Sequence, residues 1–172
     1  THPAEDYHPD HRYTSILVAD ASFLLRVPLV CPEVPALRKP TAQAWVYHWR
    51  QNNIPSAFTV AVDIDEVWQR KLAMLACHES QFFEWLPWLD GVDPSTLPKG
   101  RQARLALLDE RGGPFHRTCT VRFRSQLVER YGEARGAAVQ KAEVFYAAPY
   151  PESLSPGNAA PFFPPFAKPA IL

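Results

Sequence analysis

Two histidines near the start of the chain carry the clearest chemical signal. His8 and His11 stand three residues apart, with Pro9 and Asp10 between them, and a long apolar pattern follows directly. Proline fits the first turn of a helix and residues three apart share a face, so both imidazoles are expected to point the same way. Imidazole is the commonest metal ligand, and Asp10 can fix the tautomer of a neighbouring ring. The spacing predicts a metal or catalytic site, and equally allows a helix start with two surface histidines.

The composition limits the class of protein. The 172 residues suit one domain, and equal numbers of acidic and basic residues argue against the basic surface of a nucleic-acid-binding protein. No apolar run reaches the roughly 18 residues of a membrane span, and no signal peptide is visible. Three widely spaced cysteines form neither a disulfide framework nor a zinc knuckle, which favours a reducing, cytoplasmic compartment. The chain begins with Thr1 and opens directly on its chemical segment, so we expect a piece of a longer polypeptide.

The sequence predicts both helices and strands, and these elements must position the histidines. Helices are expected over about 9–25, 66–85, 99–110 and 115–131, with a break at Gly112-Gly113-Pro114, and strands over about 44–49, 57–64 and 141–146. Prolines mark the segment 27–40 as an extended connection. The predicted organisation is a domain over residues 1–148 followed by a Pro-rich tail over residues 149–172, non-globular or draped over the surface.

A second polar group lies near the end of the predicted helix 66–85. His78 and Gln81 share a face with apolar neighbours there, where a polar pair requires partners, and Ser80 lies between them. Either a functional role or a structural one, with His78 hydrogen-bonded to the backbone, would explain this pattern.

Three stretches taken together resemble one enzyme family. They are 6–12 (DYHPDHR), 71–81 (KLAMLACHESQ) and 141–145 (KAEVF). Their order and spacing are similar to the second half of the PIG-L/LmbE-like zinc-dependent N-deacetylases, over about residues 6–146. The resemblance implies the C-terminal part of a Rossmann-like three-layer α/β fold whose first βαβ half is absent. In that family a metal sits at the carboxyl ends of a parallel sheet.

The resemblance also implies roles for individual residues. His11 would be a metal ligand, and His8 the acid or oxyanion partner, oriented by Asp10. Tyr7 adjoins this site and could touch the oxyanion or the sugar. His78, Ser80 and Gln81 would form a supporting or structural signature. These roles make chemical sense, because a metal-activated water attacks an acetamide carbonyl and a nearby donor stabilises the developing charge.

One departure from the family pattern is large. The family's His-Pro-Asp-Asp-Glu motif, which supplies two further ligands and the general base, has no counterpart here. We reject His2-Pro3-Ala4-Glu5-Asp6 as a degraded copy, because it abuts the second motif and follows no strand. A catalytic zinc usually has three protein ligands, and His11 has no convincing partner in the sequence. We therefore expect an incomplete ligand set for zinc or another divalent metal, and an inactive fragment.

Three functional hypotheses remain from the sequence. The first is a metal-dependent hydrolase that removes an N-acetyl group from an N-acetylated sugar or glycoconjugate. The alternative is a non-catalytic carbohydrate- or protein-binding module that has lost the first metal-binding motif, with Trp45, Trp49, Trp85 and Trp88 as candidate contact residues. The third is a structural protein without a small-molecule site. An oligomer is possible, since an incomplete sheet leaves an exposed edge.

Overall fold

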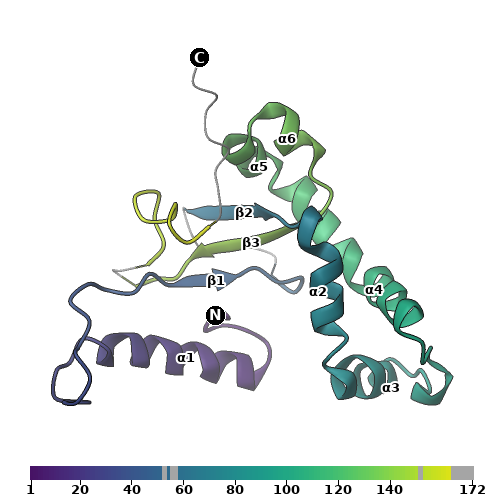
Figure 1. The fold of residues 1–172 in the computed structure, drawn as a ribbon, viewed down its shortest axis with the longest axis horizontal. Coiled ribbons are helices and arrows are strands. Elements are labelled where there is room, and N and C mark those ends of the chain that lie inside the picture. Colours follow the sequence, from purple (N-terminus) through teal and green to yellow (C-terminus); the bar gives the residue numbers. More distant parts are fainter. Residues whose placement is uncertain (52–53, 55–57, 151–152, 164–172) are drawn as a thin grey trace.

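A computed structural model of the protein describes residues 1–51, 54, 58–150 and 153–163. Its sheet has three strands, β1 (Ala44–Val46), β2 (Thr59–Asp63) and β3 (Ala142–Ala147), in the order β1-β3-β2 (Figure 1). Both neighbours pair antiparallel with β3, with Trp45 and Thr59 each opposite Tyr146. The predicted α/β class is confirmed. A Rossmann-like arrangement requires parallel strands. It is not confirmed, because these three strands run antiparallel, and it stays a prediction.

Both faces of the sheet are covered. Along β3 the buried residues alternate, so Val144 and Tyr146 enter the main core beside Trp45 and Leu127. Along β2 the neighbours Val60 and Ala61 are both buried, as the nearly continuous apolar run of this strand predicts. Val60 packs with Leu154 and Ala159 on the other face of the sheet. Residues 153–163 of the Pro-rich segment therefore lie against the domain.

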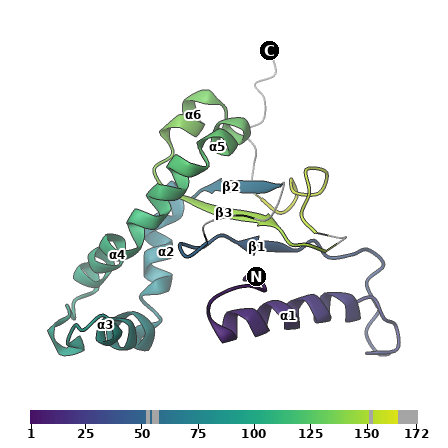
Figure 2. The same cartoon turned by 180° about the vertical axis from the view of Figure 1, so that it is seen from behind.

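The helices that follow β2 form the main helical layer. They are the short helix η1 (Asp65–Val67), α2 (Trp68–Leu75), the π-helix η2 (Gln81–Trp85), α3 (Leu86–Leu89), the 3₁₀ turn η3 (Pro94–Thr96), α4 (Arg101–Arg122), α5 (Arg124–Tyr131) and α6 (Glu133–Ala138). Cys119 and Phe123 of the α4 segment pack on the sheet in the main core. Trp68 and Leu72 of α2 meet Leu108 of α4 in a second cluster. Figures 1 and 2 show α2 and α4 side by side at one end of the sheet.

Three predicted boundaries are wrong. The predicted strand 44–49 ends at Val46, because a hydrogen-bonded turn begins at His48. The predicted helix 66–85 is interrupted after α2, and a π-helix takes its second part. The predicted break at Gly112-Gly113-Pro114 does not occur, and α4 runs through it. Packing of Leu108, His116 and Cys119 outweighs the one hydrogen bond that a helix-interior proline removes.

Helix α1 (Pro9–Leu24) follows the histidine pair, close to its predicted bounds. Figures 1 and 2 show it on the β1 side of the sheet, away from α2–α6. Its large apolar side chains are exposed, Leu17 and Phe23 at 67% and 73%, and Ser15 is its buried residue. Among the described residues, no helix is both long enough and apolar enough to cross a membrane.

Candidate metal centre

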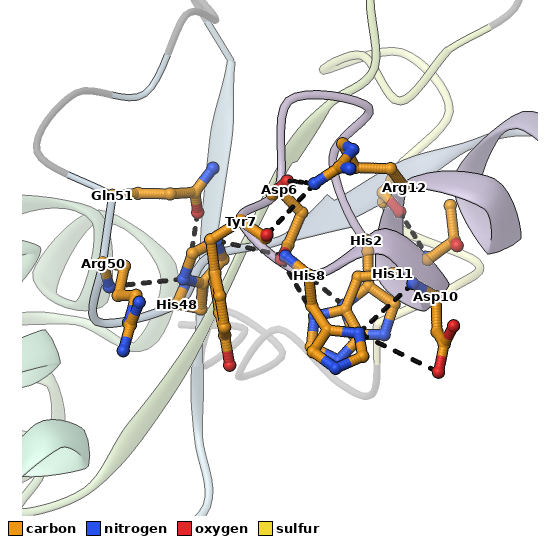
Figure 3. A network of polar contacts seen from close by, with 12 residues as sticks. His2, Asp6, Tyr7, His8, Asp10, His11, Arg12, His48, Arg50 and Gln51 are labelled. Atoms are coloured by element: carbon orange, nitrogen blue, oxygen red, sulfur yellow. Dashed lines mark hydrogen bonds and ion pairs between the residues drawn. The ribbon is translucent and has the colours of Figure 1, made fainter.

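The carboxylate of Asp6 is the centre of a group of four histidines, His2, His8, His11 and His48, called here the histidine cluster (Figure 3). Asp6 is 3% exposed. Its Oδ1 accepts hydrogen bonds from the backbone N–H of His8 at 3.0 Å and from Nδ1 of His11 at 2.9 Å. The Arg12 guanidinium fixes the same loop by donating to the backbone carbonyls of Asp6 and Tyr7. Residues from the loop and from the first turn of α1 are thus held on one buried acid.

Hydrogen bonds give His8 and His11 opposite tautomers. A carboxylate only accepts, so Nδ1 of His11 carries the proton and its Nε2 lone pair is free to bind a metal. His8 caps α1, and its Nδ1 accepts from the backbone N–H of Asp10 at 3.2 Å. Its proton therefore lies on Nε2, which becomes a donor. One ring of the pair offers a lone pair and the other offers a proton.

His2 and His48 complete the cluster from outside α1. The His2 ring stacks on His11, with centroids 4.0 Å apart. His48 follows β1, and its Nε2 lies 3.2 Å from Oδ2 of Asp6. Burial lowers the pKa of both His2 and His48 from 6.5, and it outweighs the nearby Asp6 carboxylate, which acts in the opposite direction. Both rings therefore favour the neutral form, which is the form that binds metals.

His2, Asp6 and His11 could together hold a metal ion, since each offers a ligand atom and these atoms lie within 4.8 Å of one another. Oδ2 of Asp6 is buried and accepts no hydrogen bond within the described part of the chain, so it has lone pairs for a cation. Burial raises the pKa of Asp6, but the His8 N–H and the His11 ring outweigh it, and the pKa lies below 3.8. Two neutral imidazoles and an ionised carboxylate are the donor set of many zinc sites.

The structure brings together four of the residues predicted from the sequence: Tyr7, His8, Asp10 and His11. Asp10 acts on His8 through its backbone N–H, while its carboxylate is 3.9 Å from the ring and 86% exposed. The Tyr7 ring meets those of His8 and His11 edge-on, with centroids 6.0 and 5.6 Å apart. Part of the orienting role predicted for the Asp10 carboxylate is thus performed by the backbone N–H of Asp10.

The other predicted site residues lie elsewhere. His78, Ser80 and Gln81 are exposed at the junction between α2 and the π-helix, and the His78 ring contacts Phe82. The group of described residues that could hold a metal does not include His78. Of the four tryptophans considered for a binding surface, Trp45 is a core residue at 1% exposure, whereas Trp49, Trp85 and Trp88 are exposed.

Sequence reasoning missed the partners of His11. His2 and Asp6 belong to a stretch without periodicity, and nothing in their spacing shows that the loop folds back onto the helix. His48 is distant in sequence, and its position depends on how β1 pairs with β3. The one available signal was the density of ligand-type residues over 2–11. The structure places His2 and Asp6 beside His11. The incomplete ligand set and metal binding itself both stay predictions.

Comparison of the chain with protein-family models, with curated proteins and with solved structures gave no match.

Proposed function

We propose that this chain carries the metal-binding part of a hydrolase that removes an N-acetyl group from an N-acetylated sugar or glycoconjugate. The observation that carries the proposal is the unequal pair of histidines. His11 is tied to a buried carboxylate through Nδ1 and has its Nε2 free, whereas His8 presents Nε2–H three residues earlier. Hydrolysis of an amide at a metal requires one ligand of the first kind and one donor of the second.

The residues of the histidine cluster would have different roles in the reaction. His11, through Nε2, and His2 would hold a zinc or similar divalent ion, which would supply Lewis-acid polarisation of a carbonyl and activation of water. His8 would donate a hydrogen bond from its Nε2–H to the oxygen that gains negative charge, and the leaving amine would take up the proton released by the attacking water. Asp6 keeps His11 in the metal-binding tautomer. The three free cysteines support the reducing, cytoplasmic location proposed for the protein.

Two features support a larger Rossmann-like arrangement as part of this proposal. Thr1 donates to the carbonyl of Ala44 and accepts from the N–H of Val46, both at 2.9 Å, which is the pattern of parallel pairing beside β1. The apolar side of α1 is exposed, as it would be if a further layer covers it.

Zinc stoichiometry and acetate release test the proposal. The chain should bind about one zinc, and His11→Ala and His2→Ala should each lower the affinity at least about tenfold. His8→Ala should keep the zinc, and in a protein that holds the complete site it should abolish acetate release from N-acetylated sugars. His78→Ala is the matched control, since it removes an exposed histidine outside the cluster and should change neither quantity.

The outcomes are distinct. Zinc binding that survives His11→Ala, or is lost equally in His8→Ala and His11→Ala, would contradict the assigned roles. In a protein that holds the complete site, tight zinc binding without acetate release from any N-acetylated sugar would instead favour the non-catalytic binding module.

A further inference from the structure

An arginine in contact with two aromatic rings borders the histidine cluster. The guanidinium carbon of Arg50 lies 4.2 Å from the centroid of the Tyr7 ring and 4.6 Å from that of the Trp49 ring. Tyr7 in turn contacts the rings of His11 and His48, at 5.6 and 5.9 Å between centroids. Figure 3 shows Tyr7 between Arg50 and the rings of His8 and His11. Arg50 is therefore one aromatic ring away from the candidate metal centre.

The backbone that carries Arg50 is fixed by three hydrogen bonds. The N–H of Gln51 donates to the carbonyl of His48, and the N–H of His48 donates to Oε1 of Gln51, both at 3.0 Å. The N–H of Arg50 donates to Nδ1 of His48 at 3.2 Å. The Gln51 amide also bonds the hydroxyl of Tyr146, a core residue. This turn fixes Arg50 relative to both the sheet and the histidine cluster, so little entropy remains to be lost on binding.

The stacking leaves the edge of the guanidinium available. Its carbon lies over the Tyr7 and Trp49 rings, and its N–H groups donate to no residue in the described part of the chain. Arg50 and Trp49 are exposed, the latter at 63%. The nearby carboxylate of Asp6 is buried and engaged with histidines, so it does not neutralise Arg50. A planar fork of this kind binds carboxylate and phosphoryl groups through two parallel hydrogen bonds.

We infer that Arg50 is an anion-recognition residue, and that the substrate of the proposed hydrolase is an N-acylated sugar bearing a phosphoryl or carboxylate group. This inference rests on the proposed function for the N-acyl part, and on the geometry of Arg50 for the anion. It assigns Tyr7 a positioning role, in which one face of its ring supports the guanidinium. The anionic group would lie on Arg50 while the N-acyl group reaches His8 and His11.

Binding of three matched sugars, measured by NMR titration without added metal, tests the inference. The probes are N-acetylglucosamine, N-acetylglucosamine 6-phosphate and N-acetylmuramic acid, which carry no anion, a phosphoryl group and a carboxylate respectively. At least one anionic sugar should bind roughly tenfold more tightly than the neutral sugar, the gain typical of a charge-assisted hydrogen-bond pair. The two anionic arms show which oxyanion is preferred. The gain should shrink as salt is raised, because Arg50 is exposed.

The variants separate Arg50 from charge in general. Arg50→Gln should abolish the preference for anionic sugars, and Arg50→Lys should keep a minor part of it, since lysine lacks the planar fork. Arg101→Gln is the matched control, because Arg101 is an exposed arginine at the start of α4, and the preference should persist. Equal binding of all three sugars, no binding of any, or a preference that survives Arg50→Gln would overturn the inference. Zinc binding is measured separately. If the proposed hydrolase function fails its own test, the sugar-binding result still shows whether Arg50 recognises an anion.

Discussion

One buried acid decides the chemistry of the individual residues. Asp6 uses one oxygen to fix the tautomer of His11 and to hold the His8 backbone, and it leaves the other oxygen without a hydrogen bond in the described part of the chain. The sequence predicts that His8 and His11 share a face, and a resemblance to a family suggested their unequal roles. The structure supplies a physical reason for that inequality, because the two rings have different hydrogen-bond partners.

Asp6→Asn is expected to weaken metal binding about 10–100-fold, the usual effect of removing a group that ligates or orients a metal-binding histidine. The asparagine side chain keeps the size but loses the charge, and only one of its ends can accept a hydrogen bond. Zinc affinity, measured by competition with a chelator, provides the test. Asp20→Asn removes an exposed carboxylate from α1 and should leave the affinity within about twofold. An unchanged affinity in Asp6→Asn would show that Asp6 neither binds nor orients.

Elements with strong periodicity are predicted well, and those fixed by distant contacts are not. Helix α1 and strands β2 and β3 lie close to their predicted ranges. The Gly112-Gly113-Pro114 stretch is a local breaker, yet contacts of α4 with α2 and β3 keep the helix continuous. Leu17 and Leu24, seven residues apart, fit one apolar stripe of a helix, but within this chain they are exposed. The local sequence pattern indicates which face of a helix is apolar, but it does not indicate which element covers that face.

The contact between α5 and α6 depends on a glycine. A Cβ at Gly136 would lie 2.5 Å from Cα of Val128 and 2.6 Å from the carbonyl oxygen of Leu127. These are backbone atoms that cannot move aside, so Gly136→Ala should lower the free energy of unfolding by about 2–3 kcal/mol. Gly112→Ala is the opposite case, since nothing lies within 4 Å of that Cβ in the interior of α4. It should raise stability by about 0.5–1 kcal/mol.

Urea unfolding of the two glycine variants checks this pair of predictions. A rise in stability in both variants would show that helix propensity, and not close approach of the two helices, governs these positions.

At the scale of the whole molecule, the sequence predicts the class and half of the site. The α/β class and the grouping of Tyr7, His8, Asp10 and His11 come from short-range pattern. The parts that were missed, His2, Asp6 and the turn that carries Arg50, join segments brought together by the pairing of β1 with β3. Two antiparallel pairings fix the sheet, and no periodicity in 44–49 or 141–147 states which strands are neighbours.

A buried histidine links the folding of the whole molecule to pH. His116 lies in α4 at 8% exposure, and its Nδ1 bonds the carbonyl of Ala142 in β3 at 3.0 Å. Burial lowers the pKa of His116 from 6.5, and the charge of Lys71 acts in the same direction. Below about pH 6.5 the unfolded chain binds more protons than the folded one. The contribution of His116 to the free energy of unfolding therefore has its full value above about pH 6.5 and declines as the pH falls toward the folded-state pKa.

Urea unfolding between about pH 8 and pH 5 should show this decline, and His116→Gln should reduce its slope. The glutamine amide can still donate to the carbonyl of Ala142 but takes up no proton in this range. His2 and His48 also have lowered pKa values and contribute with the same sign, so a residual slope is expected in the variant. His78→Gln is the control, because His78 is exposed, and its slope should match that of the unaltered chain. Identical slopes in His116→Gln and the unaltered chain would show that His116 does not couple folding to protonation.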